Sequence, residues 1–453
     1  MKIQLFDTFF ESKHLHDADL DDDFYEEIMR EYDDLQSDTN DPTETNATNP
    51  QSILNTPITV NEIKAAIKKT KSNNKGLDNH NMHPKMLHSF GDNALKLLEK
   101  LFNKCLDRGQ WVWDKAKVIF LKKEGKESYS VPGSYRPISI SSYIGKLLEK
   151  ILAKRIVRYL EAIGVFDPNQ EGFTSKRNTI RYLNRLNIQV KYDLSDKKAV
   201  IGLFIDFEKA FDSIWKKGLI VKMSRLNISG KILKLIDNFL ENRKVMLDVN
   251  GEVGGIRNTK AYGLPQGSAL APFLFKIYLL DILEDFEETE GITVLKFADD
   301  GTVIISAETI EQCLELLNQV MGALNRWSRK WRMVINCQKN KTEYVCFSNA
   351  KRDQDVIPAS VKLGEKDILK VTETKVLGLV VDDKLSYTPH SQMVQKKLLG
   401  KWANICKYSN NHWGFNQKVI VQIAKSLFLS SLHYAGLVWM NIKNMAEIES
   451  LCL

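Results

Sequence analysis

The chain has 453 residues, of which 43 % are hydrophobic and 27 % charged, a composition typical of a globular protein with room for two or three subdomains. No apolar run approaches the roughly 18 residues that a membrane-spanning helix needs, and the N-terminus lacks the pattern of a signal peptide, so we expect an intracellular protein without a membrane partner. Six scattered cysteines without a CxxC pair argue against a zinc knuckle or a disulfide framework.

The net charge of +7 is unevenly distributed. Residues 1–50 contain fifteen Asp and Glu against three Lys and Arg, a net charge of −12, which leaves +19 on residues 51–453. Such a basic body can neutralise phosphates, although a solvated lysine-rich surface explains the composition equally well. Residues 1–57 are acidic and rich in Thr and Asn, which predicts a mostly disordered or loosely docked arm, with at most a short helix near 24–29.

Helical patterns follow the arm. Thr59 and Glu62 precede an apolar stripe and predict a capped helix start. Residues 92–108 and 145–163 each keep one face apolar, as amphipathic helices do.

The periodicity changes at residue 198. Ala199–Ile205 is a continuous apolar run with the length of a buried strand, and Asp206 follows it directly. Ile292–Phe297 and Thr302–Ser306 bracket a short polar turn, which predicts a β-hairpin. Helical sequence at 308–330 and a further strand-like stretch at 342–347 complete an α+β pattern with a palm-like sheet.

Three carboxylates mark the ends of these predicted strands. Asp206 could cap the following helix, and Asp299 and Asp300 could be ordinary turn residues. Carboxylates gathered at one end of a sheet repel one another unless a cation lies between them, and Mg²⁺ prefers such oxygen ligands. Two ions about 4 Å apart can stabilise the attacking and leaving oxygens of a phosphoryl displacement.

The motifs around these carboxylates resemble those of the reverse transcriptase family. Phe204–Asp212 (FIDFEKAFD) resembles motif A of the palm, Gly263–Ser268 (GLPQGS) resembles motif B, and Phe297–Asp300 (FADD) resembles motif C. Four further blocks occur in the family's order, so that the resemblance covers roughly residues 58–440: Tyr135–Ser139, Gln170–Phe173, Asn336–Thr342 and Leu377–Leu379. Ala298 before the Asp pair and the sequence Arg-Pro-Ile-Ser resemble the corresponding motifs of LINE-type (non-LTR) retrotransposon enzymes of the jockey kind.

The resemblance implies a right-hand polymerase fold. Residues 58–197 would form N-terminal helices and fingers, 198–350 a palm of antiparallel sheet plus helices, and 351–453 a primer-grip hairpin with a partial helical thumb. The implied activity is RNA-directed DNA polymerisation, which extends a DNA primer on an RNA template from deoxynucleoside triphosphates with two Mg²⁺ ions, or Mn²⁺ in their place. The implied location is a ribonucleoprotein in nucleus and cytoplasm.

The resemblance also implies roles for residues in motifs A and C. Asp206 and Asp299 would be direct metal ligands, and Asp300 would support the site or coordinate less directly. The backbone carbonyl of Phe207 could complete one metal shell. Phe211 matches the steric-gate position, where its ring would crowd a ribose 2′-hydroxyl.

Further residues would bind the nucleotide. Gln266 would lie near the nascent base pair, and Lys123 and Arg136 are candidates for gripping the triphosphate. Lys341 could protonate the leaving pyrophosphate as a general acid. The block around Lys341 has extra residues compared with motif D, which leaves Lys339 as a rival.

Other functions remain open on the sequence alone. An RNA-dependent RNA polymerase is disfavoured by Phe211 and the Phe-Ala-Asp-Asp motif, and an intron maturase by the lack of further RNA-binding and splicing regions. A non-catalytic nucleic-acid-binding remnant is the rival from another class. Because no endonuclease pattern occurs and the sequence stops in the region expected for the thumb, we expect a fragment of a larger reading frame or a decayed copy.

Overall fold

The structure is a computed structural model. It describes residues 20–37, 50–71, 76–123, 125, 128–165, 167–249, 251–259, 262–347, 357–407, 414–441 and 443–444. These residues fall into two compact units, each assembled from separate stretches of chain. Unit 1 comprises Met1–Asp167, Glu208–Ile282 and Trp327–Val334, and unit 2 comprises Pro168–Phe207, Leu283–Arg326 and Ile335–Leu453.

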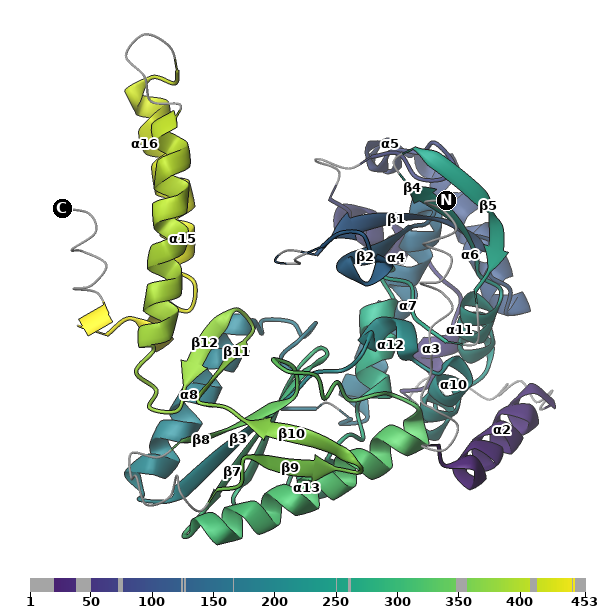
Figure 1. Cartoon of the computed structure of the whole chain (residues 1–453). Helices are drawn as coiled ribbons and strands as arrows, with labels where there is room; N and C mark the ends of the chain where they lie inside the picture. The colour runs from purple at the N-terminus through teal and green to yellow at the C-terminus, as the bar shows by residue number, and fades with distance from the viewer. Residues whose placement is uncertain are drawn as a thin grey trace. The chain divides into compact units, whose positions relative to one another are not determined.

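Unit 1 combines helices with a four-stranded sheet of order β2-β1-β4-β5 (Figure 1). Strand β1 pairs antiparallel with β2 and parallel with β4. Its strands are β1 (Lys115–Lys122), β2 (Tyr135–Ile140), β4 (Lys244–Val249) and β5 (Glu252–Asn258). Its helices are α2 (Asp22–Ser37), α3 (Ser52–Asn55), α4 (Val60–Lys68), α5 (Pro84–His88), α6 (Asp92–Arg108), α7 (Tyr143–Ala162), α9 (Ala210–Ser213), α10 (Lys216–Arg225), α11 (Lys231–Glu241) and α12 (Ala271–Tyr278). The capping box predicted at Thr59 and Glu62 is confirmed at the start of α4.

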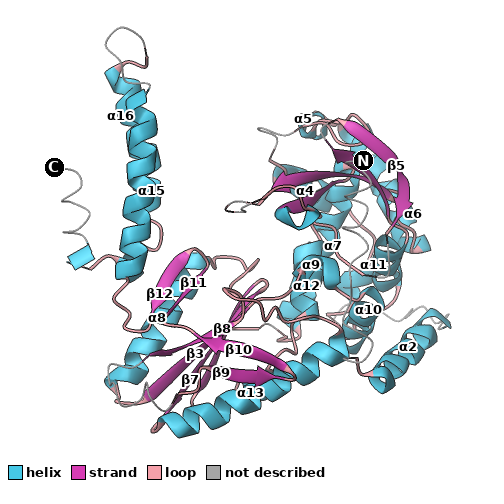
Figure 2. Ribbon diagram, viewed as in Figure 1, coloured by secondary structure: helices cyan, strands magenta, loops and turns pink. Residues whose placement is uncertain are grey.

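Unit 2 is built on a six-stranded sheet of order β6-β7-β3-β8-β10-β9 (Figure 2). Strand β3 lies inside the sheet, antiparallel to both β7 and β8. The strands are β3 (Ala199–Ile205), β6 (Ile292–Phe297), β7 (Asp300–Ala307), β8 (Glu343–Phe347), β9 (Ser360–Leu363) and β10 (Lys366–Lys370). The buried strand and the β-hairpin predicted from the sequence are therefore confirmed.

Helices cover this sheet and extend the unit. Helix α8 (Thr179–Ser195) packs against β3, β6 and β7, where Tyr182, Val200 and Ile304 belong to one buried core. A second hairpin, β11 (Glu373–Val376) and β12 (Leu379–Asp382), precedes three C-terminal helices. These helices are α15 (Thr388–Lys407), α16 (Gln417–Leu432) and α17 (Gly436–Trp439). Another long helix, α13 (Ile310–Trp331), follows β7 earlier in the chain.

The acidic arm differs from the expectation of a mostly disordered segment, because α2 is longer than the short helix predicted and packs on unit 1. Ile28 is fully buried, and Tyr25 stacks on Trp215 with ring centroids 5.2 Å apart. Glu31 pairs with Arg225 at 2.8 Å. Composition indicated disorder because acidic residues outnumber apolar ones, but the few apolar residues of α2 share one helix face. Residues 1–19 and 38–49 of the expected arm lie outside the described part of the chain.

The helices and cysteines of the described residues bear on membrane insertion and on disulfide formation. None of these helices is both long enough and apolar enough to cross a bilayer. The cysteines among the described residues, Cys105, Cys313, Cys337, Cys346 and Cys406, are free thiols.

Candidate active site

Asp206 directly follows the last residue of strand β3, and its backbone amide and carbonyl groups both form hydrogen bonds. Its carbonyl oxygen accepts a hydrogen bond from the Asn336 amide nitrogen (2.8 Å). Its amide nitrogen donates to the Thr342 hydroxyl (3.2 Å), and that hydroxyl is also 3.3 Å from the Asp206 carbonyl oxygen. The segment before β8 thus fixes where the Asp206 carboxylate emerges from the sheet.

The Asp206 side chain has two polar partners from the same segment. The Asn336 side-chain amide donates to Oδ2 at 3.0 Å, and Lys341 Nζ lies 3.3 Å from the same oxygen. The Asp206 side chain is 30 % exposed and that of Lys341 is 41 % exposed, so both can be reached from solvent. The structure thus brings Lys341 to the carboxylate, and both Lys341 and its rival Lys339 are exposed.

Asp299 and Asp300 lie at the tip of the β6–β7 hairpin. Phe297 pairs with Asp300, so that Ala298 and Asp299 form the two-residue turn. Burial, followed by the negative charges of Asp299 and Asp206, raises the pKa of Asp300 to about 7. Asp300 therefore lies close enough to Asp299 and Asp206 for their charges to repel its own, and either a proton on Asp300 or a cation between the carboxylates relieves that repulsion.

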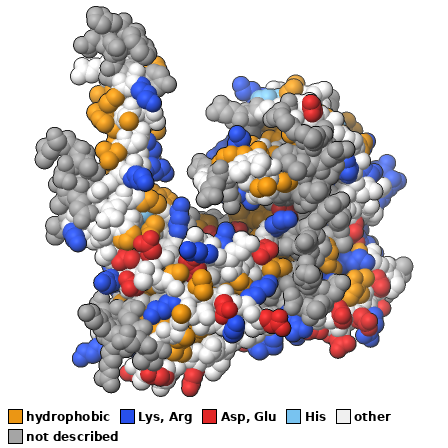
Figure 3. Space-filling view, viewed as in Figure 1, with side chains coloured by type: hydrophobic (Ala, Val, Ile, Leu, Met, Phe, Trp, Pro, Cys, Tyr) orange, Lys and Arg blue, Asp and Glu red, His pale blue; other side chains and the backbone are white. Residues whose placement is uncertain are grey.

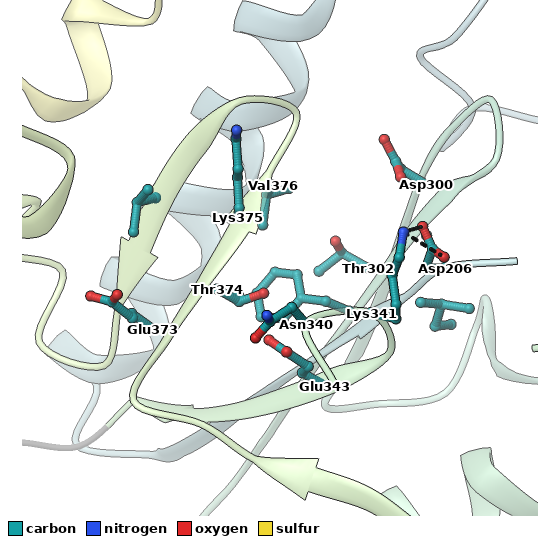
Figure 4. Close-up of a pocket in the computed structure, with 14 residues that line it drawn as sticks. Asp206, Asp300, Thr302, Asn340, Lys341, Glu343, Glu373, Thr374, Lys375 and Val376 are labelled. Carbon is teal, nitrogen blue, oxygen red and sulfur yellow. Dashed lines mark hydrogen bonds and ion pairs between the residues drawn. The ribbon is translucent and has the colours of Figure 1, made fainter. Parts of the chain in front are cut away.

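An open pocket of about 490 Å³ contains two of these carboxylates. Figure 4 shows Lys341 reaching Asp206 in this pocket, with Asp300 on the neighbouring strand. The other lining residues come from β3, β7, β8 and the β11–β12 hairpin: Phe204, Ile205, Gly301, Thr302, Asn340, Glu343, Glu373, Thr374, Lys375, Val376 and Val380.

The donor set is compatible with Mg²⁺ rather than with a metal that needs a complete protein cage. Among the described residues, no three His, Cys, Asp or Glu side chains already converge as metal ligands. Mg²⁺ is commonly held by one or two carboxylates, with water and substrate phosphates as its other ligands. Asp206 and Asp300, which line one pocket, meet that requirement, and the charge of Asp206 contributes to the raised pKa of Asp300.

The residues predicted in motifs A and B that belong to unit 1 contact one another. The Phe211 ring stacks on Phe275, with centroids 4.5 Å apart and planes 9° from parallel. The Gln266 side-chain amide donates to both carboxylate oxygens of Asp212, at 3.0 and 3.2 Å. The Leu264 amide nitrogen donates to the Phe211 carbonyl at 2.7 Å. Motif B is thereby joined to the end of motif A.

Gly267 is required in this loop. Its φ of +105° lies in the left-handed region, and a Cβ atom there would come within 2.8 Å of the Ser139 carbonyl oxygen. The Ser139 amide nitrogen also donates to the Gln266 carbonyl at 2.7 Å. The block that contains Arg136 therefore lies directly against motif B.

Lys123 directly follows β1 in unit 1, and Arg136 lies on β2, the strand that pairs with β1. Arg136 is exposed and pairs with Leu121 in the β1–β2 register. The Lys123 side chain donates to the Gly133 carbonyl at 3.0 Å, and its charge acts to lower the pKa of Asp212. Asp206, Asp299, Asp300 and Lys341 belong to unit 2, and the chain passes between the units just after Phe207.

Glu149 is a supporting residue that the sequence analysis missed. It is 1 % exposed on α7, and its Oε2 accepts from the Ser268 hydroxyl (2.6 Å) and from the Ala269 amide nitrogen (2.5 Å). The signal was available: Glu149 interrupts the apolar stripe of a predicted amphipathic helix, and a buried carboxylate needs hydrogen-bond donors.

Strands β6, β7, β3 and β8 are antiparallel neighbours and carry carboxylates at one end, which is consistent with the palm of a nucleic-acid polymerase. The family model described as reverse transcriptase (RNA-dependent DNA polymerase) matches residues 121–381, and the chain belongs to this family. Its members generally use divalent metal ions, a nucleic-acid template and nucleotide substrates.

Curated relatives come from retrotransposons. The RNA-directed DNA polymerase from mobile element jockey of Drosophila funebris is 30 % identical over 388 residues, which cover 84 % of this chain and 41 % of the relative. The probable RNA-directed DNA polymerase from transposon BS of Drosophila melanogaster is 28 % identical over 370 residues, which cover 80 % of this chain and 39 % of the relative. The chain thus spans about two fifths of the length of these relatives.

Proposed function

We propose that the chain is the polymerase region of a jockey-like, non-LTR retrotransposon protein, and that it extends a DNA primer on an RNA template. The observation that carries the proposal is that Asp206 and Asp300 line one pocket at the same end of the antiparallel strand pair β3–β7. The family match and the names of the relatives support RNA as template and deoxynucleoside triphosphates as substrates.

The carboxylates Asp206, Asp299 and Asp300 would hold two Mg²⁺ ions, which Mn²⁺ could replace, and the Phe207 carbonyl would complete one shell. Such ions stabilise the attacking 3′-oxygen and the leaving phosphate oxygens. Lys341 would donate the Nζ proton to the pyrophosphate that leaves. Its ion pair with Asp206 supports this role, because the pair keeps the ammonium group in the pocket.

Unit 1 would bind the incoming nucleotide. Lys123, just after β1, and Arg136, on β2 of the proposed fingers, would grip the triphosphate with charge-assisted hydrogen bonds. The Phe211 ring would lie beneath the sugar, and Gln266 would lie near the nascent base pair. The hydrogen bonds between Gln266 and Asp212 support a shared role of motifs A and B in nucleotide binding, because they join the two motifs into one surface.

The C-terminal part of unit 2 would hold the template–primer duplex. The β11–β12 hairpin would be the primer grip, and α15 and α16 would form part of the thumb. Lys side chains lie along these two helices (Figure 3), where Lys396, Lys397 and Lys425 are exposed and suit a phosphate backbone. As part of a retrotransposon protein, the chain would act in a ribonucleoprotein of nucleus and cytoplasm.

Primer extension by the purified protein tests this function. Asp206→Asn and Asp299→Asn each remove a ligand charge at nearly constant shape, so we expect extension with Mg²⁺ to fall by on the order of a hundredfold or more. Asp367→Asn is the matched control, because Asp367 pairs with Lys362 at 3.1 Å on the surface of unit 2. Extension near the wild-type rate by either site variant would remove that residue from the metal site.

A further inference from the structure

The turn formed by Gln170, Glu171 and Gly172 lies against the strand that leads to the catalytic hairpin tip. Gln170 forms a parallel bridge with Lys296 of β6. The Lys296 amide nitrogen donates to the Asn169 carbonyl (2.9 Å), and the Glu171 amide nitrogen donates to the Lys296 carbonyl (2.7 Å). Because β6 is the edge of the six-stranded sheet, this turn continues the sheet beyond its last strand.

The side chain of Gln170 reaches past β6 to the tip itself. It is 3 % exposed, and its Oε1 accepts hydrogen bonds from the amide nitrogens of Ala298 and Gly172, both at 2.9 Å. The Gln170 carbonyl in turn accepts from the Thr174 hydroxyl and from Arg177 Nη1, both at 3.0 Å. The acceptor that meets Ala298 is therefore fixed by contacts on its own backbone.

The Ala298 peptide needs such a partner. Ala298 has a φ of +55°, a left-handed conformation that is sterically unfavourable for a residue with a Cβ atom. It occupies the turn position directly before Asp299. A Cβ atom on Gly172 would lie 2.3 Å from the Ala298 amide nitrogen, so only glycine permits this close approach.

We propose that Gln170 is a positioning residue, which sets the direction of the Asp299 and Asp300 carboxylates by holding the left-handed Ala298 peptide. Without the acceptor, the buried Ala298 N–H has no partner in this geometry, and the turn relaxes toward another backbone conformation. A shift of about 1 Å in a catalytic group can cost on the order of a hundredfold in rate. The catalytic consequence rests on the proposed polymerase function, whereas the effect on the turn does not.

Three variants test the proposal in the full chain. Gln170→Leu removes the acceptor at similar volume, whereas Gln170→Glu keeps an oxygen that can accept both hydrogen bonds. Gly172→Ala adds a methyl group that clashes with the Ala298 amide nitrogen. Tyr182→Phe is the matched control: it deletes a buried hydrogen bond to Thr302 of the same hairpin (2.6 Å) and keeps the ring that packs edge-on against Phe297.

The first readout is amide hydrogen exchange over residues 297–301, with the protein alone. We expect exchange to rise at least tenfold in Gln170→Leu and Gly172→Ala, and to stay within about twofold of wild type in Gln170→Glu and Tyr182→Phe. Unchanged exchange in Gln170→Leu would overturn the proposal, and so would an equal rise in Tyr182→Phe.

The second readout is primer extension as a function of Mn²⁺ and Mg²⁺. For Gln170→Leu we expect kcat to fall about tenfold or more and half-saturation to move to higher metal concentration, with KM for the template–primer unchanged. A wild-type protein without extension would contradict the proposed function but leave the exchange result standing. An active wild type with an unaffected Gln170→Leu variant would contradict the positioning role alone.

Discussion

Phe211 lies flat against Phe275 and is itself only partly buried, so one face of its ring is supported and its edge can meet a ligand. If the ring closes the space beneath the sugar, a ribonucleotide must displace it. Overpacking of that kind typically costs about 1–3 kcal/mol, or roughly ten- to hundredfold in discrimination. We therefore expect Phe211→Val to raise ribonucleotide use while deoxynucleotide use falls only modestly.

The measurement is the ratio of kcat/KM for the two sugars in wild type and variant, at one Mg²⁺ concentration. Phe239→Val is the control, since Phe239 is a buried ring of unit 1 that packs edge-on against Trp111. The control should lose stability and keep the wild-type ratio. An unchanged ratio in Phe211→Val would make Phe211 an ordinary core residue.

Asp212 gives a pH-dependent prediction. Burial raises its pKa to about 6 from an ordinary value near 3.8, although the Gln266 hydrogen bond and nearby cations act in the opposite direction. The folded state then binds more protons than the unfolded state between those values, so the contribution of Asp212 to stability is lost as pH rises through 6. Asp212→Asn should therefore stabilise the protein relative to wild type above pH 6, by about 1–3 kcal/mol.

Thermal unfolding of both proteins from pH 4 to pH 8 measures this difference. It should be smallest at pH 4 and reach its full size near pH 7. If the difference in stability between the two proteins does not change with pH, folding does not raise the pKa of Asp212.

Residue-level prediction from sequence succeeded where a strand or motif placed the residue. Asp206 was expected at the end of a buried strand and Asp300 at a hairpin tip, and the structure places both in one pocket. Glu149 and the side chain of Gln170 escaped notice, because their partners are backbone amides of segments more than 100 residues away. Such partners become visible only when the pairing of the strands is known.

Helix α2 gives the prediction at the level of an element. Its docking uses Ile28 and Tyr25, whereas Asp23, Glu26 and Asp34 are exposed on the surface. Replacing these three acidic residues by Asn, Gln and Asn removes three negative charges and keeps the docking contacts. We expect template–primer binding to strengthen at low salt, because acidic groups repel phosphates, and the gain to fade as salt screens the charges.

Binding curves at 50 and 200 mM salt measure the effect. Lys68→Gln, a single change of charge on the exposed side of α4 in unit 1, provides the comparison for nonspecific charge effects and should weaken binding slightly. If the triple variant and the wild type bind with equal affinity at both salt concentrations, the charges of α2 do not influence template–primer binding.

Elements with strong local patterns were predicted well, and elements that depend on distant pairing were not. The run before Asp206 became β3 and the predicted helix at 92–108 became α6 with the same bounds. The four-stranded sheet of unit 1 went unpredicted, because β1 pairs in parallel with β4, more than 120 residues later. Neither strand carries a strict alternation that would reveal the other.

At the level of the whole molecule, the charge distribution predicts strongly salt-dependent binding. The +19 on residues 51–453 can neutralise many phosphates and release their counterions. We expect the association constant for a template–primer to fall by on the order of 10³ between 50 and 200 mM salt, with a linear log–log plot. Filter binding or fluorescence anisotropy with a catalytically silent Asp206→Asn protein gives this slope without turnover. A flat response would mean that the basic surface is not the nucleic-acid track.

The expected organisation into consecutive segments stays a prediction for fingers, palm and thumb, whereas the two compact units are each discontinuous in sequence. Local patterns identify strands and helices in order along the chain. They do not indicate that Trp327–Val334 belongs with the N-terminal half, since that assignment depends on contacts made by the end of α13.

The position of β3 inside its sheet has a consequence for synthesis of the protein. Its two neighbours, β7 and β8, follow it by about 100 and 140 residues, so a growing chain presents the apolar strand Ala199–Ile205 long before either partner leaves the ribosome. During that interval the strand has exposed edges that can pair with another chain. Slow translation between residues 206 and 343 should therefore increase aggregation, and chaperones that cover extended apolar segments should suppress it.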